Sequence, residues 1–201
     1  MLFGSTRGAT LQFGLRRPRQ HGNTLIEASL IILPMFALFF GIIDFAFLFF
    51  LQNTFQHAAR EGARFAITYS SSYNGTDCTA SQFTCITKVV QDNAFGFLGG
   101  SKSSYIVVNY YTANDLTNPV MTCQSGTCTL KGTLPQTLSN GNTVTYANEP
   151  GNAIEVLVSQ YPWNWLVPIK GFMPGSGINL TASGVDVMEG LPPGTITPPT
   201  P

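Results

Sequence analysis

Residues that carry catalysis or hold metal ions are scarce in this sequence. The 201 residues include two histidines, His21 and His57, and the four cysteines form no CxxC pair and have no histidine close by. This spacing argues against a zinc site. The sequence also lacks a Gly-x-Ser-x-Gly motif, a phosphate-binding loop and a dinucleotide fingerprint. We therefore expect a protein that is not an enzyme and that needs no cofactor.

Charge is also sparse, and it is unevenly placed. Charged residues make up 10% of the chain, and no acidic residue precedes position 22, where Arg7, Arg16, Arg17 and Arg19 lie. Without residues 1–22 the chain keeps 6 basic and 10 acidic residues, a formal charge of −4. This balance argues against a basic surface that binds nucleic acid.

The longest uncharged stretch predicts a membrane span. Residues 28–51 contain a single ionisable side chain, Asp44. A helix of this length is about 36 Å long, enough to cross a hydrocarbon core of about 30 Å. A secretory signal is the alternative, but the run is about twice the usual 7–15-residue apolar core and no Ala-x-Ala site follows promptly. Pro34 is expected to kink or loosen this helix.

The arginines that precede the span predict its orientation. Four of them lie on the N-terminal side, whereas Arg60 and Arg64 follow the span. The positive-inside rule then places the N-terminus in the cytoplasm and the C-terminal part in the periplasm or outside the cell. We therefore expect a single-pass protein of the inner (cytoplasmic) membrane.

The four cysteines fall on the predicted outer side, which suits an oxidising compartment. Four cysteines allow three pairings, and spacing does not choose among them. We favour the two local pairs, Cys78 with Cys85 and Cys123 with Cys128, because small exported β-rich domains often need such crosslinks.

The pattern of the whole chain predicts an α+β protein. Past residue 51 the apolar spacing fits a helix that continues to about Tyr69 and docks one face on its own domain. A second helix is expected over 82–98, stopped by two glycines. We divide the chain into a cytoplasmic leader (1–22), a transmembrane and membrane-proximal helix (23–69), an exported domain with a mainly antiparallel sheet (70–190) and a Pro-rich tail (191–201). Expected strands are 105–111, 127–130, 143–147, 153–161 and 178–187.

Two motifs in and around the apolar run resemble known membrane proteins. Gly22 is followed by Asn-Thr-Leu-Ile-Glu, so Glu27 lies five positions after a glycine. This resembles the prepilin-peptidase site of type IV pilins and pseudopilins, in which cleavage after the glycine makes the glutamate residue five. A Gly-Ile-Ile-Asp-Phe segment at 41–45 and an Ala-Ala-Arg-Glu-Gly-Ala-Arg block resemble the TadE-like pseudopilins of tight-adherence (Tad, or Flp) pilus systems. The residues of that block are Ala58, Ala59, Arg60, Glu61, Gly62, Ala63 and Arg64.

The resemblance implies a non-enzymatic minor pilin subunit that assists assembly of a Tad-type adhesive pilus. Its partners would be the lipid bilayer, a prepilin peptidase, other pilins or pseudopilins and the pilus assembly platform. Cleavage between Gly22 and Asn23 would create an α-amino group with which Glu27 can pair. Asp44 would need a polar partner or a protein-lined site, and a contact with another subunit is one such site. Glu27 could instead simply mark the start of the helix.

A second function class stays open at this point. The chain could be a membrane-anchored exported domain that binds cell-wall or surface glycans, through an aromatic patch around Trp163 and Trp165. Such a protein would keep residues 1–22 and would not depend on a prepilin peptidase. Packing in the core or against lipid is the other interpretation of the two tryptophans.

Overall fold

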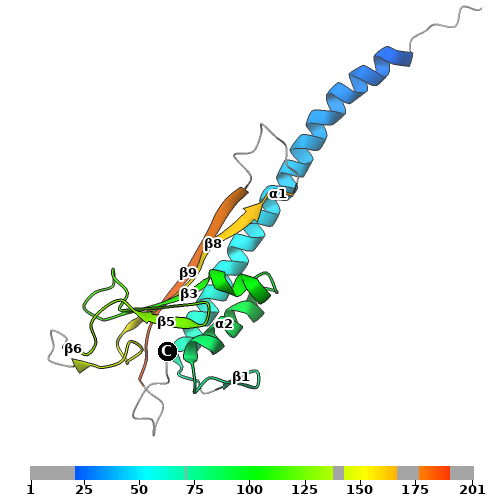
Figure 1. Ribbon diagram of the computed structural model, residues 1–201. Coiled ribbons are helices and arrows are strands. Elements are labelled where there is room, and N and C mark those ends of the chain that lie inside the picture. The colour runs from blue at the N-terminus through cyan, green and yellow to red at the C-terminus, as the bar shows by residue number, and fades with distance from the viewer. Residues whose placement is uncertain (1–20, 71, 138–142, 167–176, 191–201) are drawn as a thin grey trace, which may run out of the picture. The chain divides into compact units, whose positions relative to one another are not determined.

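The apolar run and the residues after it form one helix, α1 (His21–Ile67), which is continuous through Pro34. The computed structural model describes residues 21–70, 72–137, 143–166 and 177–190 and shows an α+β protein (Figure 1). Two units are distinguished along the chain, residues 1–41 and residues 42–201. The first unit contributes the N-terminal half of α1, and the second contains the rest of α1 and the whole sheet.

In the first unit, the apolar side chains of α1 are exposed. From Thr24 onward α1 is long and apolar enough to cross a membrane. Water would make this exposure unfavourable, whereas hydrocarbon would not. The helix therefore fits a single-pass membrane anchor. Its large exposed apolar side chains are Leu25, Ile26, Leu30, Ile31, Ile32, Leu33, Met35, Phe36, Leu38, Phe39 and Phe40.

The second unit is built on a five-stranded antiparallel sheet with the strand order β5-β4-β3-β8-β9. A further helix, α2 (Gln82–Asn93), and a 3-10 helix, η1 (Gly100–Tyr105), precede it. Two short hairpins complete the unit, β1 (Ser72–Tyr73) with β2 (Thr76–Asp77) and β6 (Gln136–Thr137) with β7 (Thr143–Val144). The strands of the main sheet are β3 (Ile106–Tyr111), β4 (Met121–Gln124), β5 (Thr127–Leu130), β8 (Ala153–Asn164) and β9 (Gly177–Val187).

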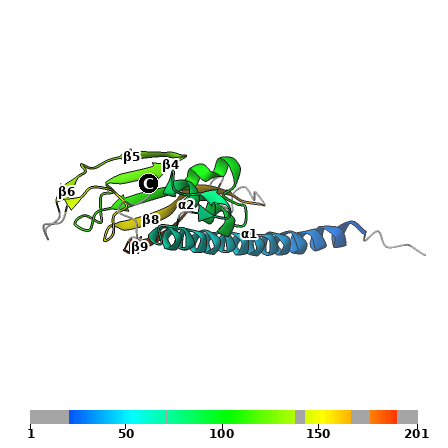
Figure 2. The same ribbon diagram turned by 90° about the horizontal axis from the view of Figure 1, so that it is seen from below.

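The hydrophobic core lies between one face of this sheet and the helices (Figure 2). Alternate residues of a strand point to the same face, and the register brings Val156 of β8 between Val108 of β3 and Gly184 of β9. A Cβ on Gly62 of α1 would lie 2.6 Å from Val90 of α2 and 3.3 Å from Val156. The second half of α1 therefore packs on both α2 and the centre of the sheet.

Gly184 lets α1 approach the edge strand β9 closely. A Cβ on Gly184 would stand 2.7 Å from the Ala59 carbonyl oxygen and 2.7 Å from the Arg60 Cα. Real Cβ atoms do not approach backbone so closely, so the glycine is required by the packing. The helix backbone lies directly against the strand at this point.

The same edge of β9 is covered by two glutamines of α1. Gln52 Nε2 donates to the Thr181 carbonyl oxygen at 2.8 Å, and Gln56 Nε2 donates to the Ser183 carbonyl oxygen at 2.6 Å. Residues four apart lie on the same side of a helix, and residues two apart point their backbone groups to the same side of a strand. The pair therefore satisfies edge groups that could otherwise recruit another strand.

A buried polar network fixes the C-terminal end of α1. Gln82 Nε2 donates to the Ala66 carbonyl oxygen at 2.7 Å, and Asn148 Nδ2 donates to Gln82 Oε1 at 3.0 Å. The Tyr69 hydroxyl donates to the Asn148 carbonyl oxygen at 2.7 Å. Burial, reinforced by the charge of Glu149, raises the pKa of Tyr69 far above its usual range, so the tyrosine stays a neutral donor.

The expected α+β class is confirmed, with differences in the individual elements. α2 ends at Asn93 and not near residue 98, because Phe95 and Gly96 turn the chain with φ angles of +50° and +80°. β4 was not expected, although its hairpin partner β5, of the same length, was. β8 continues past Pro162 to Asn164, where it pairs with β9 alone and can accommodate a proline. The two local disulfides, Cys78–Cys85 and Cys123–Cys128, are both present.

The close contact at Gly184 gives a first prediction. Gly184→Ala should lower the free energy of unfolding by about 1–3 kcal/mol, because the new methyl group meets backbone that cannot move aside. Denaturant unfolding of the full chain in detergent measures the effect.

The matched control for this substitution is Gly190→Ala. Nothing lies within 4 Å of the Cβ built at Gly190, so this variant should unfold like the parent. Equal stability of the Gly184 variant and the control would show that α1 does not press on β9.

Candidate functional site

The residues singled out at the start of α1 lie in its first two turns. The peptide bond between Gly22 and Asn23 lies in the first turn of the helix. Glu27 is exposed and has the exposed apolar neighbours Ile26 and Leu30. A carboxylate in such surroundings is costly at membrane depth unless it reaches headgroups or a partner.

Asp44 has a partner within its own chain. Only 1% of its surface is exposed, and its Oδ1 accepts a hydrogen bond of 2.9 Å from the backbone N–H of Leu166. Leu166 follows the end of β8, far away in sequence. Asp44 thus lies in a protein-lined site, which is one of the environments that a carboxylate in an apolar helix requires.

Aromatic side chains surround this hydrogen bond. Phe45 meets Trp165 edge-on with ring centroids 5.7 Å apart, and Phe47 stacks on Trp163 at 5.4 Å. The two tryptophans are only 8% and 9% exposed. The prediction of an open glycan-binding patch at these two indoles is therefore wrong, because contacts with α1 leave little of either ring exposed.

The Ala-Ala-Arg-Glu-Gly-Ala-Arg block has two distinct sides. Its small residues, Ala58, Ala59, Gly62 and Ala63, are buried against α2 and the sheet. Small side chains at these positions permit the close helix packing described above. The sequence motif is thus, on this side, a packing surface.

The charged residues of the block face outward. Arg60 and Arg64 are exposed, and Arg64 Nη1 lies 3.5 Å from Glu61 Oε1. Both arginines line a groove of about 420 Å³ beside β9, together with Gln56, Ala63, Ser183, Gly184, Val185 and Asp186. An exposed ion pair of this kind contributes little to stability, so the two arginines are available to a partner.

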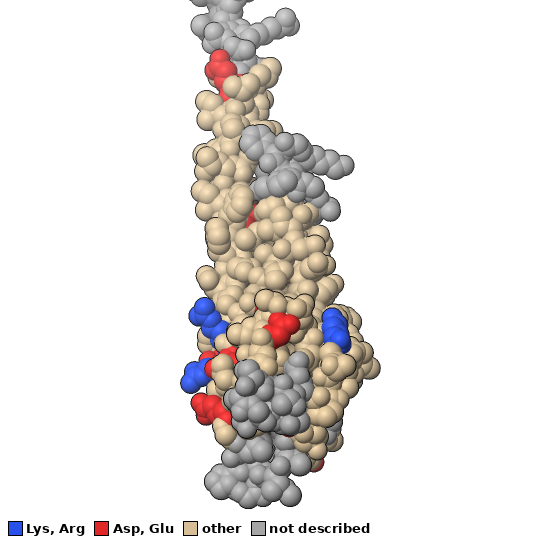
Figure 3. All heavy atoms as spheres, turned by 90° about the vertical axis from the view of Figure 1, so that its left-hand side faces the viewer, with Lys and Arg blue, Asp and Glu red and all other residues tan. Residues whose placement is uncertain are grey.

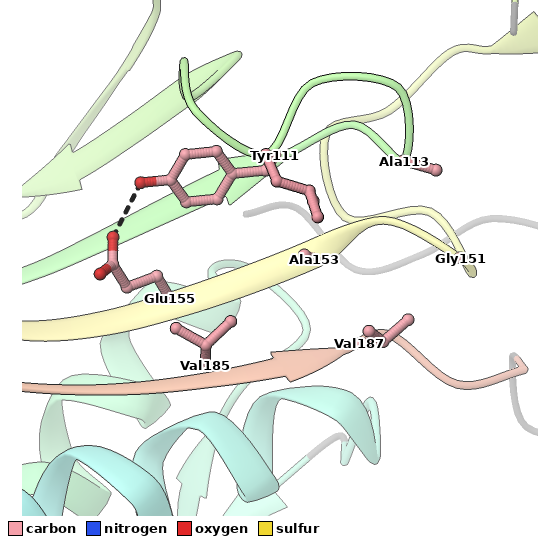
Figure 4. A pocket seen from close by; sticks show the side chains of 8 residues that line it. Tyr111, Ala113, Gly151, Ala153, Glu155, Val185 and Val187 are labelled. Carbon is pink, nitrogen blue, oxygen red and sulfur yellow. Dashed lines mark hydrogen bonds between the residues drawn. The ribbon is translucent and has the colours of Figure 1, made fainter.

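The outer face of the sheet carries a second groove, of about 380 Å³ (Figure 4). The Tyr111 hydroxyl donates to Glu155 Oε2 at 2.8 Å, and Asn109 Nδ2 donates to the same oxygen at 3.1 Å. The exposed Val185 and Val187 form its apolar side. These residues come from three neighbouring strands, and the sequence pattern did not bring them together.

The charge of this groove depends on whether Glu155 and its hydrogen-bond partner Tyr111 are ionised. Burial raises the pKa of Tyr111 to about 12, with further contributions from the hydrogen bond to Glu155 and from its charge. At neutral pH the tyrosine therefore stays neutral and donates to the carboxylate. Among the described residues, no group of three His, Cys, Asp or Glu side chains could hold a metal ion.

Comparison with known proteins relates the first helix to one family. Residues 22–64 match the family model of TadE-like proteins. The matched segment contains the glycine–glutamate motif, the apolar run with Asp44 and the Ala-Ala-Arg-Glu-Gly-Ala-Arg block, so the expected resemblance is confirmed there. No curated protein and no solved structure matches the chain. The sheet lies outside the TadE-like segment.

The hydrogen bond at Asp44 leads to a second prediction. Asp44→Leu removes the acceptor of the Leu166 N–H, and an unsatisfied buried donor costs about 1–3 kcal/mol. We expect faster hydrogen exchange at the amide of Leu166, measured by mass spectrometry on the full chain.

Asp44→Asn is the control, because its side-chain carbonyl can still accept this bond. It should keep most of the protection. Unchanged exchange in the leucine variant would mean that the contact does not hold the end of β8 on α1.

The Tyr111–Glu155 pair gives a pH prediction. The pKa of Tyr111 is higher in the folded protein than its ordinary value near 10, so its contribution to stability is complete below pH 10 and is lost as the pH rises towards 12. Ultraviolet titration of the parent minus that of Tyr111→Phe should show a tyrosine that ionises near pH 12. A difference midpoint near pH 10 would contradict the assigned contacts.

Proposed function

We propose that the chain is a minor pilin-like subunit associated with a Tad pilus, and that it assists pilus assembly after cleavage by a prepilin peptidase. The observation that carries this proposal is the match of residues 22–64 to TadE-like proteins, which coincides with a helix whose first part exposes apolar side chains on all sides. Such a helix needs lipid or other helices around it. A pilin-like subunit has lipid around this helix while it is in the membrane and other pilin helices around it after assembly.

Cleavage after Gly22 would remove the arginine-rich segment and leave a chain that begins at Asn23. Glu27 would then lie four residues from a positively charged amine, in its own subunit or in a neighbour. In apolar surroundings this attraction is strong, although desolvation offsets part of it. The exposed position of Glu27 supports a role in contacts between subunits.

The exported domain would provide the contacts outside the membrane. The N-terminus would stay in the cytoplasm, and the sheet, with its two disulfides, would lie in the periplasm or beyond. Arg60 and Arg64 would offer positive charge to a neighbouring pilin or to the assembly platform. The energy for assembly would come from a cytoplasmic ATPase, because the sequence carries no phosphate-binding loop.

The processing step is tested by intact mass and N-terminal sequencing of the membrane protein, expressed with and without a prepilin peptidase. The proposal expects a chain that starts at Asn23 only when the peptidase is present. A chain that keeps residues 1–22 in both cases would favour the membrane-anchored binding domain, for which the Glu155 groove would be the surface to examine.

The role of Glu27 is tested by Glu27→Ala in cells that assemble the pilus. The variant should insert in the membrane normally, because one charge fewer does not disfavour a span, but it should assemble less. Removing one partner of a buried ion pair costs about 3–5 kcal/mol, so assembled subunits should fall at least severalfold.

Glu189→Ala is the matched control, since Glu189 is an exposed carboxylate of the second unit. It should assemble like the parent. Full assembly of the Glu27 variant would reject the proposed pairing.

A further inference from the structure

Several described positions of the exported domain, from Phe45 onward, leave large apolar side chains exposed. Phe45, Phe49 and Phe50 of α1 are exposed, and so are Phe95, which is 76% exposed, and Leu166, which is 57% exposed. We call these five residues the aromatic collar. Soluble surfaces seldom expose several large apolar side chains together, and such patches usually mark a binding surface.

Contacts within the domain connect the members of the collar. Phe45 packs on Trp165, next to Leu166, whose N–H binds Asp44. Phe50 packs on Phe97 with ring centroids 6.4 Å apart. Phe50 and Phe95 also line one groove of about 370 Å³ between α1 and the end of α2.

The backbone at Phe95 supports a function for this surface. Its φ angle of +50° lies in the left-handed region that residues other than glycine rarely adopt. Such strain persists where the surrounding structure imposes it, and it is often found at functional positions. Here the turn holds a phenylalanine ring away from the core.

Polarity changes in an ordered way along β8. Trp165 packs on Phe45, and Trp163 packs on Phe47. Tyr161 lies about 7 Å along the strand from Trp163. Its hydroxyl accepts a hydrogen bond of 3.0 Å from Lys102 Nζ. An apolar zone, then tryptophan, then tyrosine with lysine is the order found from the acyl chains to the headgroups of a bilayer.

Among the described residues, Asp92 lines the groove that Phe50 and Phe95 share, together with His57, whereas α1 carries no charged side chain for a long stretch after Asp44. On α1, the next Lys, Arg, Asp or Glu after Asp44 is Arg60, about 24 Å along the helix. On the face drawn in Figure 3, most blue and red atoms gather at one end of the domain, and a long uncharged zone adjoins them. The uncharged zone continues in sequence into the apolar half of α1.

We infer that the aromatic collar rests in the outer lipid interface, so that the exported domain is seated on the membrane and not merely tethered to it. This inference rests on the proposed membrane position of α1. The outer edge of the hydrocarbon core then lies near Asp44 and not near Leu51. Between Glu27 and Asp44 there are about 26 Å of helix, close to the thickness of a hydrocarbon core.

In this position the Asp44–Leu166 hydrogen bond removes two unfavourable polar groups from contact with lipid. Strand ends leave backbone groups that are costly next to hydrocarbon, and a carboxylate is costly there too. Each satisfies the other. The contact therefore lets the end of β8, with the exposed Leu166, reach the lipid interface.

The two tryptophans are the only ones in the chain, which makes the inference directly measurable. The full chain is inserted in phosphatidylcholine–phosphatidylglycerol vesicles that carry bromine either near the headgroup end or near the methyl end of the acyl chains. We expect a loss of tryptophan fluorescence that is larger with bromine near the headgroup. Aqueous iodide should cause little loss.

Single-tryptophan variants and collar variants refine the measurement. Trp163→Phe and Trp165→Phe separate the two probes, and Trp165 should be quenched by lipid more strongly. A double variant, Phe95→Ser with Leu166→Ser, should raise quenching by iodide. Leu130→Ser is the matched control, since Leu130 is 63% exposed on β5 and should change neither reading.

The outcomes distinguish this inference from the proposed function. Membrane insertion is verified separately by resistance to carbonate extraction, and processing by the N-terminal mass. An inserted chain whose tryptophans are quenched by iodide but not by lipid would reject the collar and leave the pilin-like proposal intact. Protection from both quenchers would also reject it, because the tryptophans would then be shielded by the domain itself and not by lipid. A chain that fails to insert would reject the anchor itself.

Discussion

The structure depends on the close contact between one helix and one edge strand. At Gly184 the strand β9 lies against the backbone of α1 near Ala59, and no side chain larger than hydrogen fits between them. Dense packing of this kind gains many small dispersion contacts and excludes water. It also explains why the block shared with TadE-like proteins is rich in alanine and glycine on one side. The sheet is built onto the helix, and the second half of the helix is part of its core.

Polar side chains on α1 and α2 form hydrogen bonds with backbone groups of other elements. Asp44 accepts from the N–H of Leu166, Gln52 and Gln56 donate to carbonyls of β9, and Gln82 of α2 donates to Ala66. Buried backbone groups must be paired, because an unpaired group costs about as much as a lost hydrogen bond. These contacts therefore hold the sheet in one register along the helix. They also cover a strand edge that could otherwise pair with another chain.

The environment of α1 changes along its length. Upstream of Gly41 its apolar side chains are exposed on all sides, whereas from Leu51 onward one face is buried in protein. Between these parts lie three residues of the aromatic collar, Phe45, Phe49 and Phe50. A helix that passes from lipid to a folded core needs such an intermediate zone, since tryptophan and phenylalanine tolerate both surroundings.

Much of this organisation is determined by the sequence alone. The apolar run, the glycine–glutamate motif, the continuing helix and most strands of the sheet are visible because composition and periodicity are local properties. The local disulfides were favoured over two other pairings for a general reason. β4 was missed because its pairing with β3 and β5 makes it a strand, and the early end of α2 was missed because a turn at Phe95 and Gly96 decides it. These features are decided by neighbours in space.

The tertiary structure alone decided what surrounds the key side chains. Asp44 and Leu166 are 122 residues apart, and no local pattern predicts that a carboxylate in an apolar helix meets the end of a distant strand. The burial of Trp163 and Trp165, the need for glycine at position 184 and the groove at Glu155 likewise arise only when β8 and β9 are placed beside α1 and β3. A sequence records which residues can be buried or paired. Packing determines which of them actually meet.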